Sequence, residues 1–247
     1  MKPHLKVEIW IVLGISLGQS AVYAVVSLLA KLARGPLGES QASLNPSRSD
    51  LPWLDVTLQL LGIGFALVPV VLALYLLARD ADAPPVLERI GLRGSNPLRD
   101  TLMGFVLAAV IGIPGLGVYI LGREFGLTAD LVLAPEKLYA WSITMLVLAA
   151  VKNALLEEVI VVGYLMTRLR DGGWGMWAVI FTSALLRGTY HLYQGLGQAF
   201  GNVLMGVIFG WWYYRTRRLW PLIIAHALID IVAFAGYALL PDLVAKL

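Results

Sequence analysis

The sequence predicts an all-α fold, a polytopic helical bundle embedded in a membrane. Of its 247 residues, 59% are hydrophobic and only 14% are charged, and the mean hydropathy is +0.77. This balance lies outside the usual range of a soluble globular domain. Apolar runs long enough to cross a hydrocarbon core of roughly 30 Å predict about seven transmembrane helices, with eight as the alternative. These runs lie near residues 9–30, 54–78, 100–121, 138–167, 175–195, 199–214 and 219–240.

The distribution of basic residues predicts the orientation of these spans. With the N-terminus inside, the inner segments hold 11 Lys and Arg and the outer segments hold 6, and cytoplasmic loops are enriched in these residues. The first apolar run is longer than the core of a signal peptide and has no convincing cleavage site, so we interpret it as an uncleaved span. We therefore expect an integral protein of a bacterial plasma membrane, with a cytoplasmic N-terminus and the lipid bilayer as a partner.

The composition also excludes several kinds of protein and site. The sequence pI is near 9.2, but the 19 Lys and Arg are spread along the chain and the net charge is only +3. No nucleic-acid partner is expected from such a pattern. The absence of cysteine excludes disulfides, thiolate nucleophiles and Cys-ligated metals. Any chemistry must come from carboxylate, imidazole, hydroxyl or amine groups.

One integral membrane domain is expected over residues 1–247, because no internal repeat divides the chain. Residues 1–125 are expected to form helices and contain no recognised motif. Residues 138–235 carry the polar motifs, and we interpret them as a catalytic core. Within that core, Gly206 and Gly210 lie one helical turn apart. Small residues at this spacing allow two helices to approach closely.

Ionisable side chains within the predicted spans are the strongest functional signal. Such a side chain costs at least about 2.5 kcal/mol at the centre of a helix on the insertion scale, so it is a functional candidate by default. Three predicted spans carry such polar groups. The first has Glu157 and Glu158, with Lys152 and Asn153 about one turn earlier. The second has Arg187 and His191, and the third has His226 and Asp230.

Hydrolysis is the chemistry that these groups fit, in one of two forms. A carboxylate and a histidine that converge on one water would form a general base. A second histidine, with its tautomer fixed by Asp230 four residues away, would donate to a developing oxyanion. Two histidines and one glutamate are also the ligand set of a catalytic zinc ion. The residues alone leave both forms open.

The two adjacent glutamates should have different roles. Neighbouring residues of an α-helix point about 100° apart, so we expect one glutamate to act as a base and the other to pair with Lys152 or Arg187. A purely structural ion pair is the alternative for both cations. For Asn153, an interhelical hydrogen bond is the simplest interpretation.

The order and spacing of these motifs resemble those of the CAAX-protease and bacteriocin-processing family, intramembrane peptidases related to the type II CAAX prenyl endopeptidase. That family carries EExxxR, FxxxH and HxxxN or HxxxD motifs on three helices. Glu157 and Glu158 match the first motif, His191 the second, and His226 with Asp230 the third. The resemblance implies that Glu157 and His191 activate a water molecule, while His226 and Asp230 stabilise the oxyanion.

Two positions depart from the family pattern. Val162 stands where EExxxR has its arginine, and Arg187 stands where FxxxH has its phenylalanine. We expect a charge swap, in which Arg187 neutralises Glu158 from the histidine helix. Glu158, Arg187 and Asn153 are therefore predicted to support the catalytic residues.

The resemblance implies a peptidase whose substrate is a membrane-associated peptide or protein. The family is commonly described as metalloprotease-like, but we expect no required cofactor, because the glutamate–histidine scheme uses all four residues without an ion. If zinc is required, its expected ligands are Glu157, His191 and His226. The alternatives are an inactive relative that acts as a scaffold or immunity protein, and a proton-coupled transporter. Transport is disfavoured because the sequence shows no internal symmetry.

Overall fold

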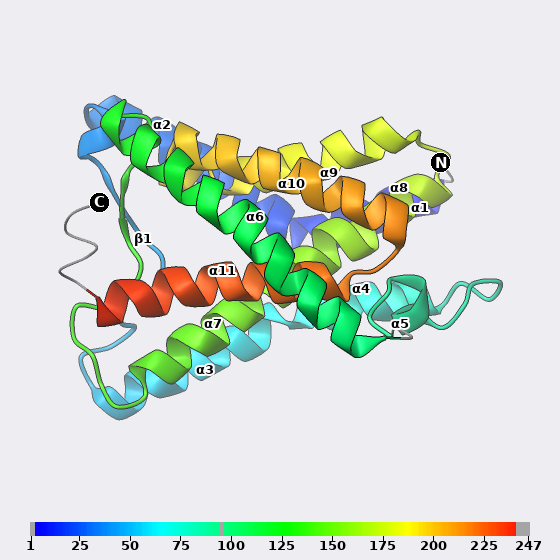
Figure 1. The fold of residues 1–247 in the computed structure, drawn as a ribbon, viewed down its shortest axis with the longest axis horizontal. Helices are drawn as coiled ribbons and strands as arrows, with labels where there is room; N and C mark the ends of the chain where they lie inside the picture. The colour runs from blue at the N-terminus through cyan, green and yellow to red at the C-terminus, as the bar shows by residue number, and fades with distance from the viewer. Residues whose placement is uncertain (1–2, 94–95, 241–247) are drawn as a thin grey trace.

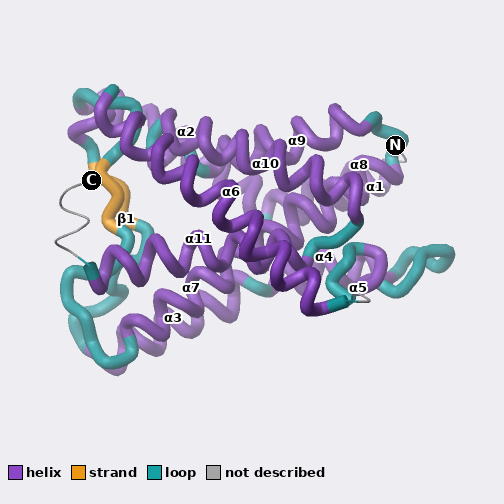
Figure 2. The backbone as a smooth tube through the Cα atoms, in the orientation of Figure 1, coloured by secondary structure: helices purple, strands orange, loops and turns teal. Residues whose placement is uncertain are grey.

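The structure, a computed structural model, describes residues 3–93 and 96–240 and is nearly all-α, with 76% of residues in helices (Figure 1). Figure 2 shows that helices dominate the whole bundle and that loops gather at its two ends. The principal helices are α1 (Pro3–Gly14), α2 (Leu17–Arg34), α3 (Pro52–Ala66), α4 (Val68–Ala78), α5 (Val86–Arg89), α6 (Pro97–Glu124), α7 (Ser142–Glu157), α8 (Met166–Asp171), α9 (Met176–Tyr190), α10 (Leu196–Thr216) and α11 (Trp220–Leu239). A π-helix, η2 (Glu158–Leu165), joins α7 to α8, and short 3-10 turns, η1 (Leu37–Glu39) and η3 (Leu192–Gln194), follow α2 and α9.

Three helical segments in the described residues are long and apolar enough to cross a membrane, which marks an integral membrane protein. They are Pro52–Ala78, Pro97–Glu124 and Trp220–Leu239, and a fourth is obtained if α1 and α2, which meet at 55°, form one span. The predicted count of seven or eight is not confirmed, although helices cover each predicted run. Two of the predicted runs are interrupted or short as helices, since α7 is continued by a π-helix and α9 has only 15 residues.

Proline and asparagine determine where several long helices begin. Pro52 and Pro97 occupy the first positions of α3 and α6, where the missing N–H is not needed and the fixed φ suits the helix. The Asn96 side chain caps α6 by accepting a hydrogen bond of 3.0 Å from the N–H of Arg99. Pro69 follows the short break between α3 and α4.

Close packing of α9 on α10 positions one wall of the site. A Cβ on Gly206 would lie 2.7 Å from the Cα of Ala184, and one on Gly210 would lie 3.3 Å from the side chain of Ile180. The two glycines therefore face α9, and the close approach predicted from their spacing is confirmed. In the same bundle, α11 packs against both α6 and α7.

A small sheet departs from the predicted all-α fold. Strand β1 (Gln41–Ser43) pairs in parallel with β2 (Asp130–Val132), with Ala42 opposite Leu131. Both strands have three residues, which is too short for an alternating pattern to be recognised in the sequence. They tie two loops together at the end of the bundle opposite α5 (Figure 1).

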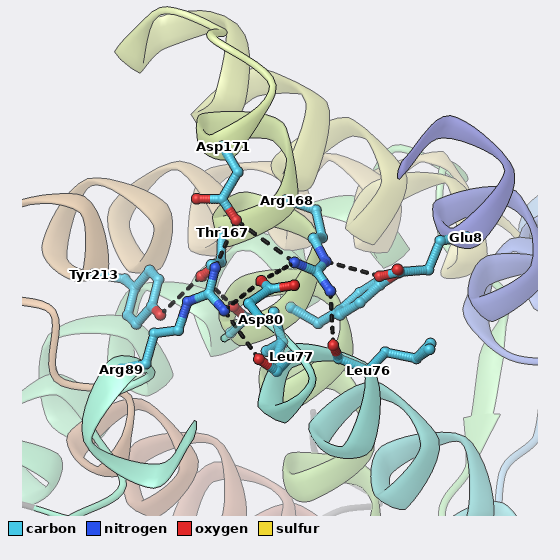
Figure 3. A network of polar contacts seen from close by, with 11 residues as sticks. Glu8, Leu76, Leu77, Asp80, Arg89, Thr167, Arg168, Asp171 and Tyr213 are labelled. Carbon is cyan, nitrogen blue, oxygen red and sulfur yellow. Dashed lines mark hydrogen bonds and ion pairs between the residues drawn. The ribbon is translucent and has the colours of Figure 1, made fainter. Parts of the chain in front are cut away.

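A network of charged side chains joins several helices at the other end of the bundle (Figure 3). Arg168 in α8 is only 2% exposed and donates to Glu8 in α1 at 2.7 Å and to Asp80, which follows α4. Arg89 in α5 donates to Asp80 and to Asp171, both at 2.7 Å. All of these residues come from segments that the charge count assigns to the inner side, so the network agrees with that segmentation.

Asp80 responds to two opposing effects in this network. Burial acts to raise the pKa of the Asp80 carboxyl, but hydrogen bonds and charges from Arg89 and Arg168 outweigh it, and the pKa lies below its usual value. The contribution of Asp80 to stability is therefore present near neutral pH and is lost as the pH falls through this lowered pKa.

We expect Arg168→Gln to reduce the free energy of unfolding by about 1 to 3 kcal/mol, because it removes the shared donor of Glu8 and Asp80. Arg170→Gln is the matched control, since Arg170 is an exposed arginine of the same helix. Thermal unfolding of both variants in one detergent checks the prediction. The difference in the free energy of unfolding between Arg168→Gln and the wild type should become smaller in acid, because Asp80 is then protonated. Equal stability of the two variants at neutral pH would contradict the prediction.

Candidate active site

The predicted site residues gather at one large cavity of about 1860 Å³ between helices α6, α7, α10 and α11 and the end of α9. Most of the residues that line this cavity are apolar. Its polar wall contains five of the seven predicted residues, namely Asn153, Glu157, His191, His226 and Asp230. The other two, Glu158 and Arg187, are fully buried beside that wall.

A change of helix type separates the two adjacent glutamates. Glu157 is the last residue of α7, and Glu158 is the first residue of the π-helix η2. Short π-helical segments within α-helices are rare, and those that occur often lie at functional sites. Here the change of winding begins at the residues that carry the two carboxylates.

The guanidinium of Arg187 is shared by both carboxylates. Its Nη2 lies 2.6 Å from Oε1 of Glu158, and its Nη1 lies 3.4 Å from Oε2 of Glu157. The predicted ion pair with Glu158 is therefore present, and the same guanidinium also lies near Glu157. Val162 is fully buried in the apolar core. Lys152, the other predicted partner, donates to the side chain of Asn153 instead.

A tyrosine that the sequence analysis did not single out holds Glu157. The hydroxyl of Tyr190 donates to Oε2 of Glu157 at 2.8 Å, so this oxygen receives bonds from both Tyr190 and Arg187. In the part of the chain that the structure describes, no protein group donates to the other oxygen, Oε1. A tyrosine next to a histidine has no distinctive sequence pattern, and its role arises only where the end of α9 meets the end of α7.

The backbone fixes the tautomer of His191. Its Nδ1 lies 2.9 Å from the carbonyl oxygen of Arg187, and a carbonyl oxygen can only accept a hydrogen bond. Nδ1 therefore carries the hydrogen, and the neutral ring has its lone pair on Nε2. Glu157 and His191 thus provide an oxygen and a nitrogen that can accept protons at the same cavity wall.

The second histidine is held by a different carboxylate from the one predicted. Nδ1 of His226 lies 2.7 Å from Oε1 of Glu158, whereas its Nε2 lies 3.8 Å from Oδ2 of Asp230, too far for a hydrogen bond. The expectation that Asp230 fixes the tautomer of His226 is therefore corrected, and Glu158 has this position. Asp230 instead accepts a hydrogen bond of 3.2 Å from Nδ2 of Asn153.

The predicted zinc ligands do not assemble into a metal site in this arrangement. Among the described residues, no three His, Asp or Glu side chains are placed to hold a metal ion together. The hydrogen bonds of His191 and His226 use Nδ1, and those of Glu157 use Oε2, so Nε2 of each histidine and Oε1 of the glutamate are the atoms that could face an ion. Within the described ranges, these atoms are not placed as a set of three around one ion. The expectation that no cofactor is needed stays a prediction.

Comparison with known proteins gives a family for this part of the chain. Residues 139–232 match the family model described as type II CAAX prenyl endopeptidase Rce1-like. No curated protein and no solved structure matches the chain. The matched segment begins just before α7 and ends in α11, so it contains every wall of the site that carries a candidate residue. The resemblance predicted from the motifs is therefore confirmed: residues 139–232, with all of the candidate site residues, match the CAAX-protease family.

Proposed function

We propose that the protein is an intramembrane endopeptidase of the CAAX-protease type, which uses an activated water molecule to hydrolyse a peptide bond. The observation that carries the proposal is that Glu157 and His191 line the same cavity, each with an acceptor atom that no described protein group occupies. The match to an endopeptidase family supports the same class of reaction. The oxygen belongs to α7 and the nitrogen to the turn that follows α9, so only the folded bundle presents them together.

The reaction begins with a water molecule between the free oxygen of Glu157 and Nε2 of His191. These groups take a proton from the water as its oxygen attacks the carbonyl carbon of the peptide. The carbonyl oxygen becomes an oxyanion, which His226 stabilises by donating from Nε2 when its ring carries the second proton. The proton held by the Glu157–His191 pair then passes to the amine as the C–N bond breaks.

The surroundings of the pair indicate which substrates can reach it. The cavity is large, its lining is mainly apolar, and it extends along α6, one of the helices apolar enough to span a membrane. A membrane-associated peptide or a lipid-modified protein terminus suits such a cavity, because its apolar parts bury surface on entering. We place the protein in a bacterial plasma membrane with a cytoplasmic N-terminus, on the basis of its charge distribution.

Glu157→Gln should lower the cleavage rate by about 10²- to 10⁴-fold, because the amide retains the volume of the side chain but cannot take a proton from water. Its thermal midpoint should stay near that of the wild type. Cleavage is measured by mass spectrometry in detergent, with a farnesylated CAAX peptide and an unmodified apolar peptide as separate substrates. Wild-type turnover by Glu157→Gln would refute its role as a base.

Glu158→Gln is the matched comparison, and its main effect should be on stability. The substitution removes the charge that pairs with buried Arg187 and binds His226, at a cost of about 3 to 5 kcal/mol. Thermal unfolding in the same detergent measures this loss. A stable Glu158→Gln protein without activity, beside an active Glu157→Gln protein, would show that the two glutamates must exchange roles.

Treatment with a chelator tests whether cleavage requires a metal ion. We expect cleavage to survive extended treatment with EDTA or phenanthroline, because the proposed base and oxyanion donor act without an ion. A zinc peptidase treated in parallel shows that the chelator works in that detergent. Loss of activity that added zinc restores would instead assign zinc ligands to this site.

The charge swap is tested by a double-mutant cycle. Arg187→Phe leaves two buried carboxylates without their cation and should cost about 3 to 5 kcal/mol. Val162→Arg alone should also destabilise the protein, because it brings a second buried cation toward the same carboxylates. The double variant restores the arrangement of the family motifs and should recover much of the loss, a coupling that independent sites do not show. Additive losses in thermal stability and rate would mean that Arg187 does not replace the missing arginine.

A further inference from the structure

The oxyanion of the proposed reaction needs donors, and Asp230 is poorly suited to be one of them. An ionised carboxylate only accepts hydrogen bonds, so it would repel the developing negative charge. The structure shows Asp230 in an acceptor role, because its Oδ2 receives the hydrogen bond from Nδ2 of Asn153. A donor beside His226 must therefore come from another residue.

Asn153 is held with its amide nitrogen toward the site. Its Oδ1 accepts from the ammonium of Lys152, and its Nδ2 donates to Asp230. An ammonium has only donors and an ionised carboxylate only acceptors, so these two contacts fix which end of the amide faces Asp230. Lys152, Asn153 and Asp230 all line the cavity.

The contact with Asp230 uses only one of the two N–H groups of the Asn153 side-chain amide. A primary amide nitrogen carries two hydrogens, and the hydrogen bond to Asp230 is the single bond from Nδ2 within the described residues. Asn153 also lies four residues before Glu157 in α7, and residues at this spacing share one face of a helix. The free N–H and the proposed base are therefore neighbours on the same cavity wall.

We propose that Asn153 is a catalytic residue, whose second Nδ2–H donates to the oxyanion together with His226. In this assignment, Asp230 is a positioning residue that holds the amide in place, and Lys152 fixes the other end of the amide. The inference rests on the proposed peptidase function and deepens it. It gives the negative charge two donors from different helices, α7 and α11.

Exchange of the amide and the carboxylate tests this assignment. Asn153→Ala and Asn153→Asp should each lower kcat by about 10²- to 10³-fold, the usual effect of losing one oxyanion donor, with little change in KM. The double variant Asn153→Asp/Asp230→Asn keeps one amide and one carboxylate in contact but moves the amide to α11. It should regain at least about 10-fold in kcat over Asn153→Asp, because an amide donor again lies at the site.

Asn45→Ala is the matched control for the loss of an amide. The Asn45 side chain donates to the carbonyl oxygen of Leu133 at 2.8 Å and ties two loops together. This variant should lose stability and keep its kcat, whereas Asn153→Ala should lose kcat. Peptide cleavage and thermal unfolding are measured for all variants in the same detergent.

A second measurement does not depend on turnover. A peptidyl phosphonate has anionic oxygens that mimic the tetrahedral intermediate, so Asn153→Ala should bind it about 10²-fold more weakly. Binding of the uncleaved peptide to the inactive Glu157→Gln protein should be the same with and without Asn153→Ala. Wild-type kcat in Asn153→Ala, no recovery in the exchange variant, or unchanged phosphonate binding would overturn the assignment while leaving the peptidase function intact. A wild-type protein that cleaves no peptide would overturn both.

Discussion

The buried guanidinium of Arg187 is the interaction on which the rest of the site depends. It is fully buried and faces two carboxylates, and a buried charge that lacks a partner is very costly. Its contact with Glu158 joins α9 to η2, and the contact of Glu158 with His226 extends the connection to α11. One chain of charge-assisted contacts therefore fixes three helices relative to one another before any substrate enters.

The surroundings of the two glutamates separate their roles. Glu158 is enclosed and contacts Arg187 and His226, so it stabilises the arrangement of the helices. Glu157 reaches the cavity, where one of its oxygens is held by Tyr190 and Arg187. Side chains of identical chemistry thus occupy different environments, because adjacent residues of a helix point about 100° apart.

The cation that neutralises the buried carboxylates here lies at a position that differs from the family motif. The glutamate helix has Val162 where the motif has an arginine, and α9 supplies Arg187 instead. Physically, the buried carboxylates need a positive group nearby, and in this structure α9 supplies it. The close approach of α9 and α10 at Gly206 brings α10 against the Arg187 side chain, since a Cβ at Gly206 would lie 3.4 Å from the Cδ of Arg187.

The sequence by itself determined the helical class, the membrane setting, the family resemblance and the residues of the site, because polar side chains in apolar runs are costly and therefore conspicuous. It also predicted the pairing of Arg187 with Glu158. Only the tertiary structure decided the π-helix, the role of Tyr190, and the partners of His226 and Asp230. Those features depend on the rotation and register of helices that meet from distant parts of the chain. A local pattern shows that a polar group needs a partner, but the packing of the bundle selects which partner it has.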